Sequence, residues 1–357
     1  MSHDTLSDVL RSVRLQSALF FYVSCHGKWA AEAPPSREIA AAVMPGAHHV
    51  IAYHVVTEGQ CWAAIVGESP RKLHRGDIIL LPQGDPHVVS YAPGMRAAPR
   101  ASAYYDMRHQ RRPFRVSYDS DGEPQVAPCT SDSVCTNEGA STTLVCGFIG
   151  CDMRPFNPLI ATLPRFLHLC GNGGNAWSEQ FVRLAATESS RRRPGSDALL
   201  ERLSEMMFVD AVRRHTDTMP EDSTGWLAGL RERFVGRALA LMHEQPAAPW
   251  TIGELGRQVG LSRSALHERF IELIGQPPMQ YLTHWRMQLA SGLLRDTRSS
   301  VAAIALEVGY DSEAAFARAF KRIVGAPPAT WRRMHREVTR PSEALLPTRT
   351  TTHLGTE

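Results

Sequence analysis

Two short sets of residues in the C-terminal half, called here the polar sets although one member is an alanine, can contact the edges of DNA bases. The first set is Arg263, Ser264, His267 and Glu268, and the second set is Glu313, Ala314 and Arg318. Arginine can bind guanine through two hydrogen bonds, histidine can donate to or accept from a base edge, and glutamate can accept from the amino group of cytosine. This chemistry requires an element that carries each set into the major groove.

Each set lies in one copy of a repeated unit. The copies are TIGELGRQVGLSRSALHERFIELIGQPP (251–278) and SVAAIALEVGYDSEAAFARAFKRIVGAPP (300–328). Each copy predicts a short helix, a turn that contains glycine, and a second helix that begins at a serine N-cap, Ser262 or Ser312. The apolar residues of the second helices fall on one face, so the polar sets face outward. The pattern therefore predicts two tandem helix-turn-helix units.

The segment between the units and the charge of this half support a nucleic-acid partner. Residues 280–295 predict one long helix that holds the units at a fixed separation, and recognition helices on one face of a duplex enter successive major grooves about 34 Å apart. Residues 226–357 hold 17 basic side chains, 16 of them arginine, against 12 acidic ones, whereas residues 1–225 hold 22 basic and 24 acidic ones. An excess of arginine is typical of a surface that binds phosphate and guanine.

The segment 230–336, and above all its ending GYDSEAAFARAFKRIVGAPPATWRR, resembles the C-terminal DNA-binding domain of the AraC/XylS family of bacterial transcription regulators. The resemblance implies that both polar sets contact bases or phosphates of double-stranded promoter DNA. It also implies RNA polymerase as a further partner. Activation is the commoner habit of that family, so we expect an activator rather than an enzyme.

The N-terminal half has a different pattern, because short apolar runs alternate with Gly and Pro turns between residues 40 and 118, as in a β-sandwich or barrel. The run GDIILLPQGDPH (76–87) is similar to the second cupin motif, and the matching residues are Gly76, Pro82, Gly84 and His87. The first cupin motif is kept at Gly46, His54 and Glu58 and has Ala52 in place of its first histidine. Residues 5–185 therefore resemble the cupin-type sensor domain found on a subset of AraC-like regulators. Residues 119–143 are polar and predict a long exposed loop.

The predicted barrel has two chemical interpretations that involve a bound group. It can hold a small-molecule effector, with His54 and His87 as inward-facing polar groups. Alternatively, His54, Glu58 and His87 can ligate an iron or zinc ion, with His48 or His49 replacing the missing histidine. The metal interpretation would make the chain a metal-dependent cupin enzyme with an appended DNA-binding module.

The cysteines give a third interpretation, a redox sensor without a ligand. All seven cysteines lie in the first half with no Cys-x-x-Cys pair, and an odd number without a secretion signal predicts reduced thiols. Cys25 and Cys146 sit where some cupin-type relatives place oxidant-responsive thiols. Cys129, Cys135 and Cys151 are candidate partners for a disulfide.

The fold class expected from these patterns is α+β and multidomain, with a β-barrel followed by helices. The expected division is 1–185 for the cupin-like sensor, 186–225 for a helical dimerisation segment and linker, 226–337 for the double helix-turn-helix, and 338–357 for a tail. The helix predicted at 197–215 has a broad apolar stripe, which must pack on its own barrel or on a second copy in a homodimer. No segment approaches the roughly 18 apolar residues of a membrane span, and the first residues lack the apolar core of a signal peptide, so we expect a cytoplasmic protein.

Overall fold

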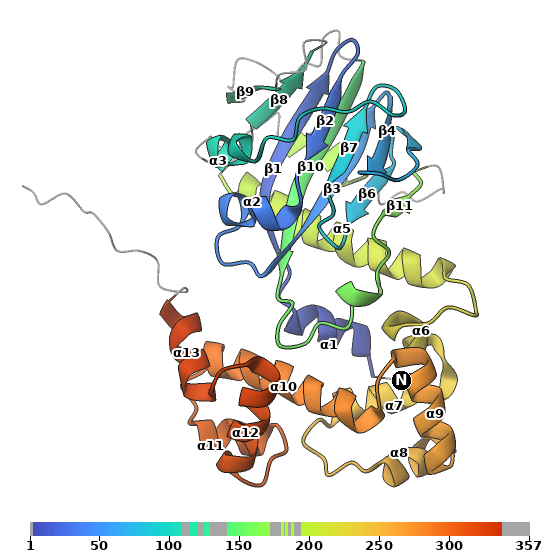
Figure 1. Ribbon diagram of the computed structural model, residues 1–357, viewed down its shortest axis with the longest axis vertical. Helices are drawn as coiled ribbons and strands as arrows, with labels where there is room; N and C mark the ends of the chain where they lie inside the picture. The colour runs from blue at the N-terminus through green and yellow to red at the C-terminus, as the bar shows by residue number, and fades with distance from the viewer. Residues whose placement is uncertain are drawn as a thin grey trace, which may run out of the picture.

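The computed structural model describes residues 3–108, 114–119, 124–128, 141–171, 180–181, 183–184, 187–188 and 194–337. The predicted tail at 338–357 lies outside the described residues, as do Cys129 and Cys135. The described strands all lie in the first half of the chain, and the C-terminal half is helical (Figure 1). This arrangement confirms the predicted α+β class.

The strands form two sheets that face each other. The larger sheet has the order β11-β6-β3-β10-β1-β8-β9, with bounds β1 Gln16–Cys25, β3 His49–Glu58, β6 Ile78–Leu81, β8 Phe114–Tyr118, β9 Pro124–Pro128, β10 Thr142–Cys151 and β11 Leu167–Leu169. The smaller sheet has the order β2-β7-β4-β5, with bounds β2 Ala30–Ala33, β4 Gln60–Ile65, β5 Arg71–His74 and β7 His87–Ser90.

Strand β3 shows how the sequence builds two cores on one sheet. Val50, Ala52 and Val56 face the interior between the sheets. The alternate residues Ile51 and Tyr53 face the opposite side, which helix α5 (Ser196–Thr218) covers. Because both faces of the strand are buried, its residues form an almost continuous apolar run and not an alternation of apolar and polar residues.

Two predictions for the N-terminal half need correction. The half predicted to be β-rich also contains the helices α2 (Ser36–Val43) and α3 (Ala101–Arg108). The predicted loop at 119–143 contains β9, a short strand whose ends are both proline and which pairs with β8 at the edge of the sheet. An edge position tolerates proline because one side of the strand needs no ladder hydrogen bonds.

The remaining described helices make up the C-terminal half and its junction with the barrel. They are α1 Thr5–Ser12, η1 Ile160–Thr162, α6 Trp226–Arg231, α7 Arg233–Glu244, α8 Ile252–Val259, α9 Arg263–Ile274, α10 Pro278–Asp296, α11 Val301–Glu307, α12 Glu313–Val324 and α13 Pro328–Glu337. Helix α1 packs against α7 and α10, although it belongs to the N-terminal end of the chain (Figure 1). Within the described part of the chain, no helix is long and apolar enough to cross a membrane.

One hydrophobic core runs from the outer face of the large sheet into the helical C-terminal half. Its members include Tyr53 of β3, Phe208 of α5, Trp226 of α6, Leu239 of α7 and Trp285 of α10. The last helices have a separate core built around Phe316, Phe320 and Trp331. The first helix-turn-helix unit therefore shares a core with the barrel, and the second unit has its own.

Candidate nucleic-acid interface and barrel interior

The first predicted helix-turn-helix unit is formed by α8 and α9. Helix α8 ends at Gly260, whose φ of +83° is a left-handed conformation that favours glycine. Helix α9 begins at Ser262, whose Oγ accepts a hydrogen bond from the Ala265 N–H at 3.1 Å. Leu266 and Phe270 are fully buried and anchor the helix. The opposite face leaves the first polar set exposed, namely Arg263, Ser264, His267 and Glu268.

The second unit, α11 and α12, repeats this construction. Ser312 Oγ accepts from the Ala315 N–H at 3.2 Å and caps α12, which ends at Gly325 with a φ of +89°. Phe316 and Phe320 are fully buried. The second polar set is exposed, namely Glu313, Ala314 and Arg318. Each cap, turn and apolar anchor is where the repeat predicts it.

Arg286 of α10 connects the two units, and the sequence analysis missed it. Its guanidinium donates to the carbonyl oxygens of Pro246 at 2.7 Å and Ala248 at 2.8 Å, in the segment before α8, and of Gly309 at 3.2 Å, in the turn of the second unit. Because the guanidinium donors have a fixed planar arrangement, these three bonds define the orientation of one unit relative to the other. In the sequence, Arg286 is a single arginine between two apolar residues of a predicted long helix. Helical periodicity does not show which groups the side chain of such an arginine contacts.

Helix α10 also contacts the barrel half directly. The Gln288 side chain donates to the Ser12 carbonyl at 2.9 Å and accepts from the Phe156 N–H at 3.1 Å. Arg295 forms an ion pair with Asp152 at 2.9 Å, and both side chains are largely buried. The same helix that joins the two helix-turn-helix units is therefore fixed to the barrel half.

In the barrel interior, the two histidines of the cupin-like motifs meet. Nε2 of His54 and Nε2 of His87 lie 2.7 Å apart, and Nδ1 of His54 lies 2.9 Å from Sγ of Cys146. His87 Nδ1 lies 3.0 Å from the carbonyl oxygen of Asp85, which can only accept, so His87 donates there and its Nε2 must accept. It follows that His54 donates through Nε2 and that Cys146 donates its S–H to His54 Nδ1. We call this run of hydrogen bonds, Cys146–His54–His87–Asp85, the barrel relay.

Every group in the barrel relay is uncharged. Burial lowers the pKa of His54 well below its usual value, with a further contribution from His87, and burial also lowers the pKa of His87. Burial raises the pKa of the Cys146 thiol well above its usual value. Desolvation disfavours the charged form in each case, so both imidazoles are neutral and Cys146 is a thiol at neutral pH.

The other predicted metal ligands of the barrel do not join this pair. Glu58 is exposed at the end of β3. His49 Nε2 lies 2.6 Å from the Pro82 carbonyl, and His48 pairs with Asp152 at 3.2 Å. The His54, Glu58 and His87 set therefore does not fit a cupin-type metal centre in this arrangement.

The cysteines proposed as redox sensors are buried and separated along their strands. Cys25 pairs with Thr142 and Phe21 pairs with Cys146 in the β1–β10 ladder, so the two cysteines are offset by four residues, or about 13 Å. A disulfide needs Cα atoms closer than about 7 Å, so these two cysteines cannot bond directly in this register. Burial raises the pKa of the Cys25 thiol, and it raises the pKa of Cys151 to about 12. Low thiolate content slows oxidation of all three.

The apolar stripe of the predicted dimerisation helix is largely covered by the protein's own barrel. Leu200, Leu203 and Met207 of α5 are buried in the core shared with the large sheet. Leu199 and Met206 remain 39% and 54% exposed, and their spacing of seven residues places them on one side of the helix.

Comparison with known proteins finds a family model for each half of the chain and relatives of nearly its full length. A cupin family model matches residues 4–217, and a helix-turn-helix domain model matches residues 255–334. A Streptomyces lividans protein named as an AraC-like transcription regulator is 30% identical over 332 residues, which is 92% of this chain and 98% of that protein. The transcriptional regulator AlkR of Acinetobacter baylyi is 26% identical over 92% of this chain and 99% of its own length. The DNA-binding domain of AdpA, solved in complex with a target DNA, is 27% identical over 30% of this chain and 95% of that domain, with a TM-score of 0.29.

Proposed function

Because the chain belongs to the AraC-like family of DNA-binding transcription regulators with an N-terminal cupin domain, we propose that its two polar sets read promoter DNA under the control of a signal received in the barrel. The observation that supports this most directly is the pair of capped recognition helices, each with its apolar side buried and its polar set exposed. The regulator acts as an activator and contacts RNA polymerase on the promoter.

The side chains of the polar sets suggest a division of roles. Arg263 and Arg318, one on each recognition helix, read guanine through bidentate hydrogen bonds. His267 and Glu268 lie one turn further along α9 and read neighbouring bases. Ala314, which has no polar atom in its side chain, allows close approach and contacts a thymine methyl group. Ser264 and Glu313 sit at the first turns of their helices, where the Ser264 hydroxyl donates to a phosphate oxygen and the Glu313 carboxylate accepts from a cytosine amino group.

The barrel relay is the proposed site of the signal. It places uncharged hydrogen-bonding groups inside an apolar wall, which favours a small, uncharged molecule that exchanges hydrogen bonds with His54 or His87. The redox alternative has less support because burial keeps the thiols protonated. A cupin-type metal enzyme has less support because Glu58 is exposed away from the histidine pair.

A homodimer is proposed through the outer side of α5. Leu199 and Met206 are exposed there, and a second copy covers them in the dimer. Two linked DNA-binding halves on adjacent half-sites add their affinities through effective concentration.

Selection and sequencing of host genomic fragments bound by the purified full chain tests the function. We expect a few promoters that share a two-block motif with blocks about one helical turn apart. Parallel selections in reductant and in mild oxidant test the redox alternative, which predicts different fragments in the two conditions. Arg37→Ala, a change of an exposed arginine on α2 away from the recognition helices and from α5, is the matched control for Arg263→Ala. Equal enrichment by wild type and Arg263→Ala contradicts the proposed reading of bases by α9.

A test of the signal site compares molecules that co-purify with the wild-type chain and with His87→Gln. Native mass spectrometry of protein isolated from its host is expected to show a bound small molecule that the variant loses. Retention of the same molecule by the variant places the signal site elsewhere.

A further inference from the structure

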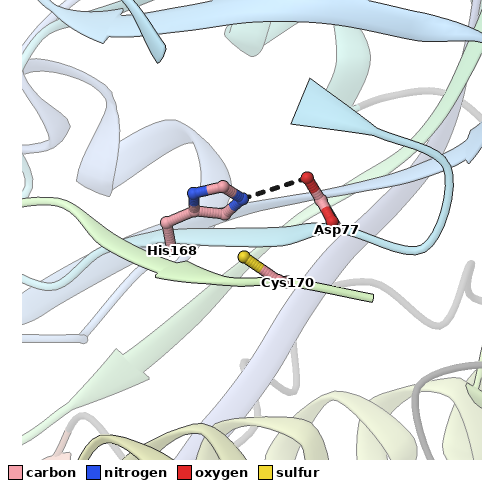
Figure 2. Close-up of side chains that lie close together, drawn as sticks. All are labelled: Asp77, His168 and Cys170. Carbon is pink, nitrogen blue, oxygen red and sulfur yellow. Dashed lines mark hydrogen bonds and ion pairs between the residues drawn. The ribbon is translucent and has the colours of Figure 1, made fainter. Parts of the chain in front are cut away.

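A second group of polar side chains lies at the end of the larger sheet, apart from the barrel relay. Asp77 is in the turn before β6, His168 is in β11, and Cys170 follows β11 by one residue (Figure 2). One ligand atom from each of these residues lies within 4.8 Å of the others, which holds for no other group of three among the described residues. His168 Nε2 is 3.1 Å from Asp77 Oδ2 (Figure 2).

Backbone hydrogen bonds hold Asp77 in place, and neither of them involves the ring of His168 or the sulfur of Cys170. Asp77 is 4% exposed, and its two carboxylate oxygens accept from the N–H groups of Gly171 at 2.8 Å and His74 at 3.0 Å. Gly171 approaches the turn so closely that a Cβ on it would lie 2.5 Å from the carbonyl carbon of Gly76. The chain after β11 is therefore pressed against the β5–β6 turn, which brings Cys170 to Asp77.

We propose that Asp77, His168 and Cys170 bind a zinc ion. A thiolate, an imidazole and a carboxylate form a mixed donor set that suits zinc, which prefers four tetrahedral ligands. The donor atoms of a tetrahedral zinc site lie about 3.3–3.8 Å apart. The distance between His168 Nε2 and Asp77 Oδ2, now 3.1 Å, therefore needs to increase only slightly for both atoms to bind the ion. On binding, Cys170 releases its thiol proton, and the His168 proton moves to Nδ1 so that Nε2 becomes a ligand.

The fourth ligand is available from the same turn. His74 Nδ1 lies 3.9 Å from Asp77 Oδ2, and the His74 side chain is 54% exposed, so a rotation can bring the ring to the ion. Water can occupy this position in a variant that lacks the imidazole.

The zinc site is separate from the barrel relay. On β6, Ile79 pairs with His54 of β3 on one side and with His168 of β11 on the other. Two strand spacings therefore separate the two histidines, about 10 Å between backbones. The bound ion ties the β5–β6 turn to the end of β11, where Arg214 of α5 donates to the Cys170 carbonyl at 3.2 Å. Zinc thus stabilises the contact between the barrel and the helix that leads to the DNA-binding half.

Cobalt titration of the reduced, metal-free, untagged full chain tests this site, because Co²⁺ occupies tetrahedral zinc sites and its bond to a thiolate gives a charge-transfer absorption. We expect one equivalent of Co²⁺ to produce this absorption and one equivalent of Zn²⁺ to abolish it. Cys170→Ser is expected to lose the absorption, and His168→Gln to weaken Zn²⁺ binding at least tenfold in competition with a chelator. Cys170 is exposed, so its replacement leaves the core intact.

Two control variants distinguish this site from the barrel interior. Cys61→Ser and Cys146→Ser change buried thiols and are expected to retain the absorption with unchanged stoichiometry. The proposal is overturned if the wild-type chain binds no stoichiometric metal. It is also overturned if Cys170→Ser keeps the absorption, or if a buried-thiol variant loses it while Cys170→Ser does not.

Discussion

Replacement of Arg286 by lysine is predicted to uncouple the two DNA-binding units while each unit stays folded. The guanidinium holds three carbonyl oxygens, of Pro246, Ala248 and Gly309, at 2.7–3.2 Å. A lysine ammonium is a single point donor and cannot span the three, so at least one hydrogen bond to a charged group is lost, at about 1.5–3 kcal/mol. The second unit then samples orientations that do not match the second groove.

The expected loss appears in the affinity for two-block DNA. A free-energy loss of about 1.5–3 kcal/mol corresponds to roughly 10- to 150-fold weaker binding. Fluorescence anisotropy with a selected promoter fragment measures this loss, and a fragment with the second block scrambled measures binding through the first unit alone. We expect Arg286→Lys to bind the scrambled fragment within about twofold of wild type.

The control is Arg37→Lys, which conserves the charge of an exposed arginine on α2 and is expected to bind both fragments as wild type does. The reasoning is refuted if Arg286→Lys binds the two-block fragment with wild-type affinity. It is equally refuted if the variant loses affinity for both fragments to the same degree, since that result indicates a general loss of folding.

Three further predictions concern the recognition helix, a turn and the barrel. Arg318→Ala should weaken specific binding by about 1–3 kcal/mol and relax the preference at one base pair, whereas an equal loss on all sequences in the same anisotropy assay would assign Arg318 to a phosphate. Gly309→Ala should lower the free energy of unfolding by about 1–3 kcal/mol in urea denaturation, because Gly309 has a φ of +83° and a Cβ would lie 2.7 Å from the Ala247 carbonyl oxygen. Gly292→Ala is its control, since a Cβ there meets nothing within 4 Å, and it should stabilise by about 0.5–1 kcal/mol; similar effects of the two changes would contradict the turn argument. Burial lowers the pKa of His54 and His87 below the ordinary 6.5, so the unfolded chain binds more protons than the folded chain below that pH. The contribution of these two groups to the free energy of unfolding should therefore be complete above pH 6.5. It should fall below pH 6.5 by up to about 1.4 kcal/mol per pH unit for each group. Urea denaturation at pH 7.5 and 5.5 measures this fall, and His87→Gln should reduce it; an unchanged fall in the variant would place the responsible groups elsewhere.

The helix-turn-helix units could be predicted from the sequence because their signals are local. Ser262 and Ser312 cap their helices as predicted, and Gly275 and Gly325 end them in left-handed conformations. Two copies of the same local pattern confirm each other, which a single copy cannot do.

The cupin-like motifs predicted the positions of His54 and His87 but not their chemistry. The motif spacing places both histidines on inward-facing strand positions, and the structure brings them together. Their partners Cys146 and Asp85 depend on strand register, which no short motif encodes. The contact of His168 with Asp77 depends likewise on the pairing of β11 with β6, strands that are far apart in the chain.

The elements missed in the N-terminal half have weak or mixed local signals. Strand β9 is five residues long and both its terminal residues are proline, so its composition indicates a loop. The contacts of Arg286 and Gln288 were missed for a different reason. Helical periodicity shows which side of α10 is buried, but it does not show which carbonyl groups face that side.

The core shared by the barrel and the first helix-turn-helix unit has a thermodynamic consequence that runs in both directions. Tyr53 of the large sheet and Trp285 of α10 belong to one packed cluster, whereas Phe316 and Phe320 belong to another. A molecule that binds the barrel, as proposed above, and changes the packing of the sheet would therefore alter the stability of the first unit directly and that of the second unit through α10. By linkage, a DNA fragment that engages the first unit would then change the affinity of the barrel for that molecule by the same factor. Promoter DNA and the proposed small molecule would each act as an effector of the other's binding.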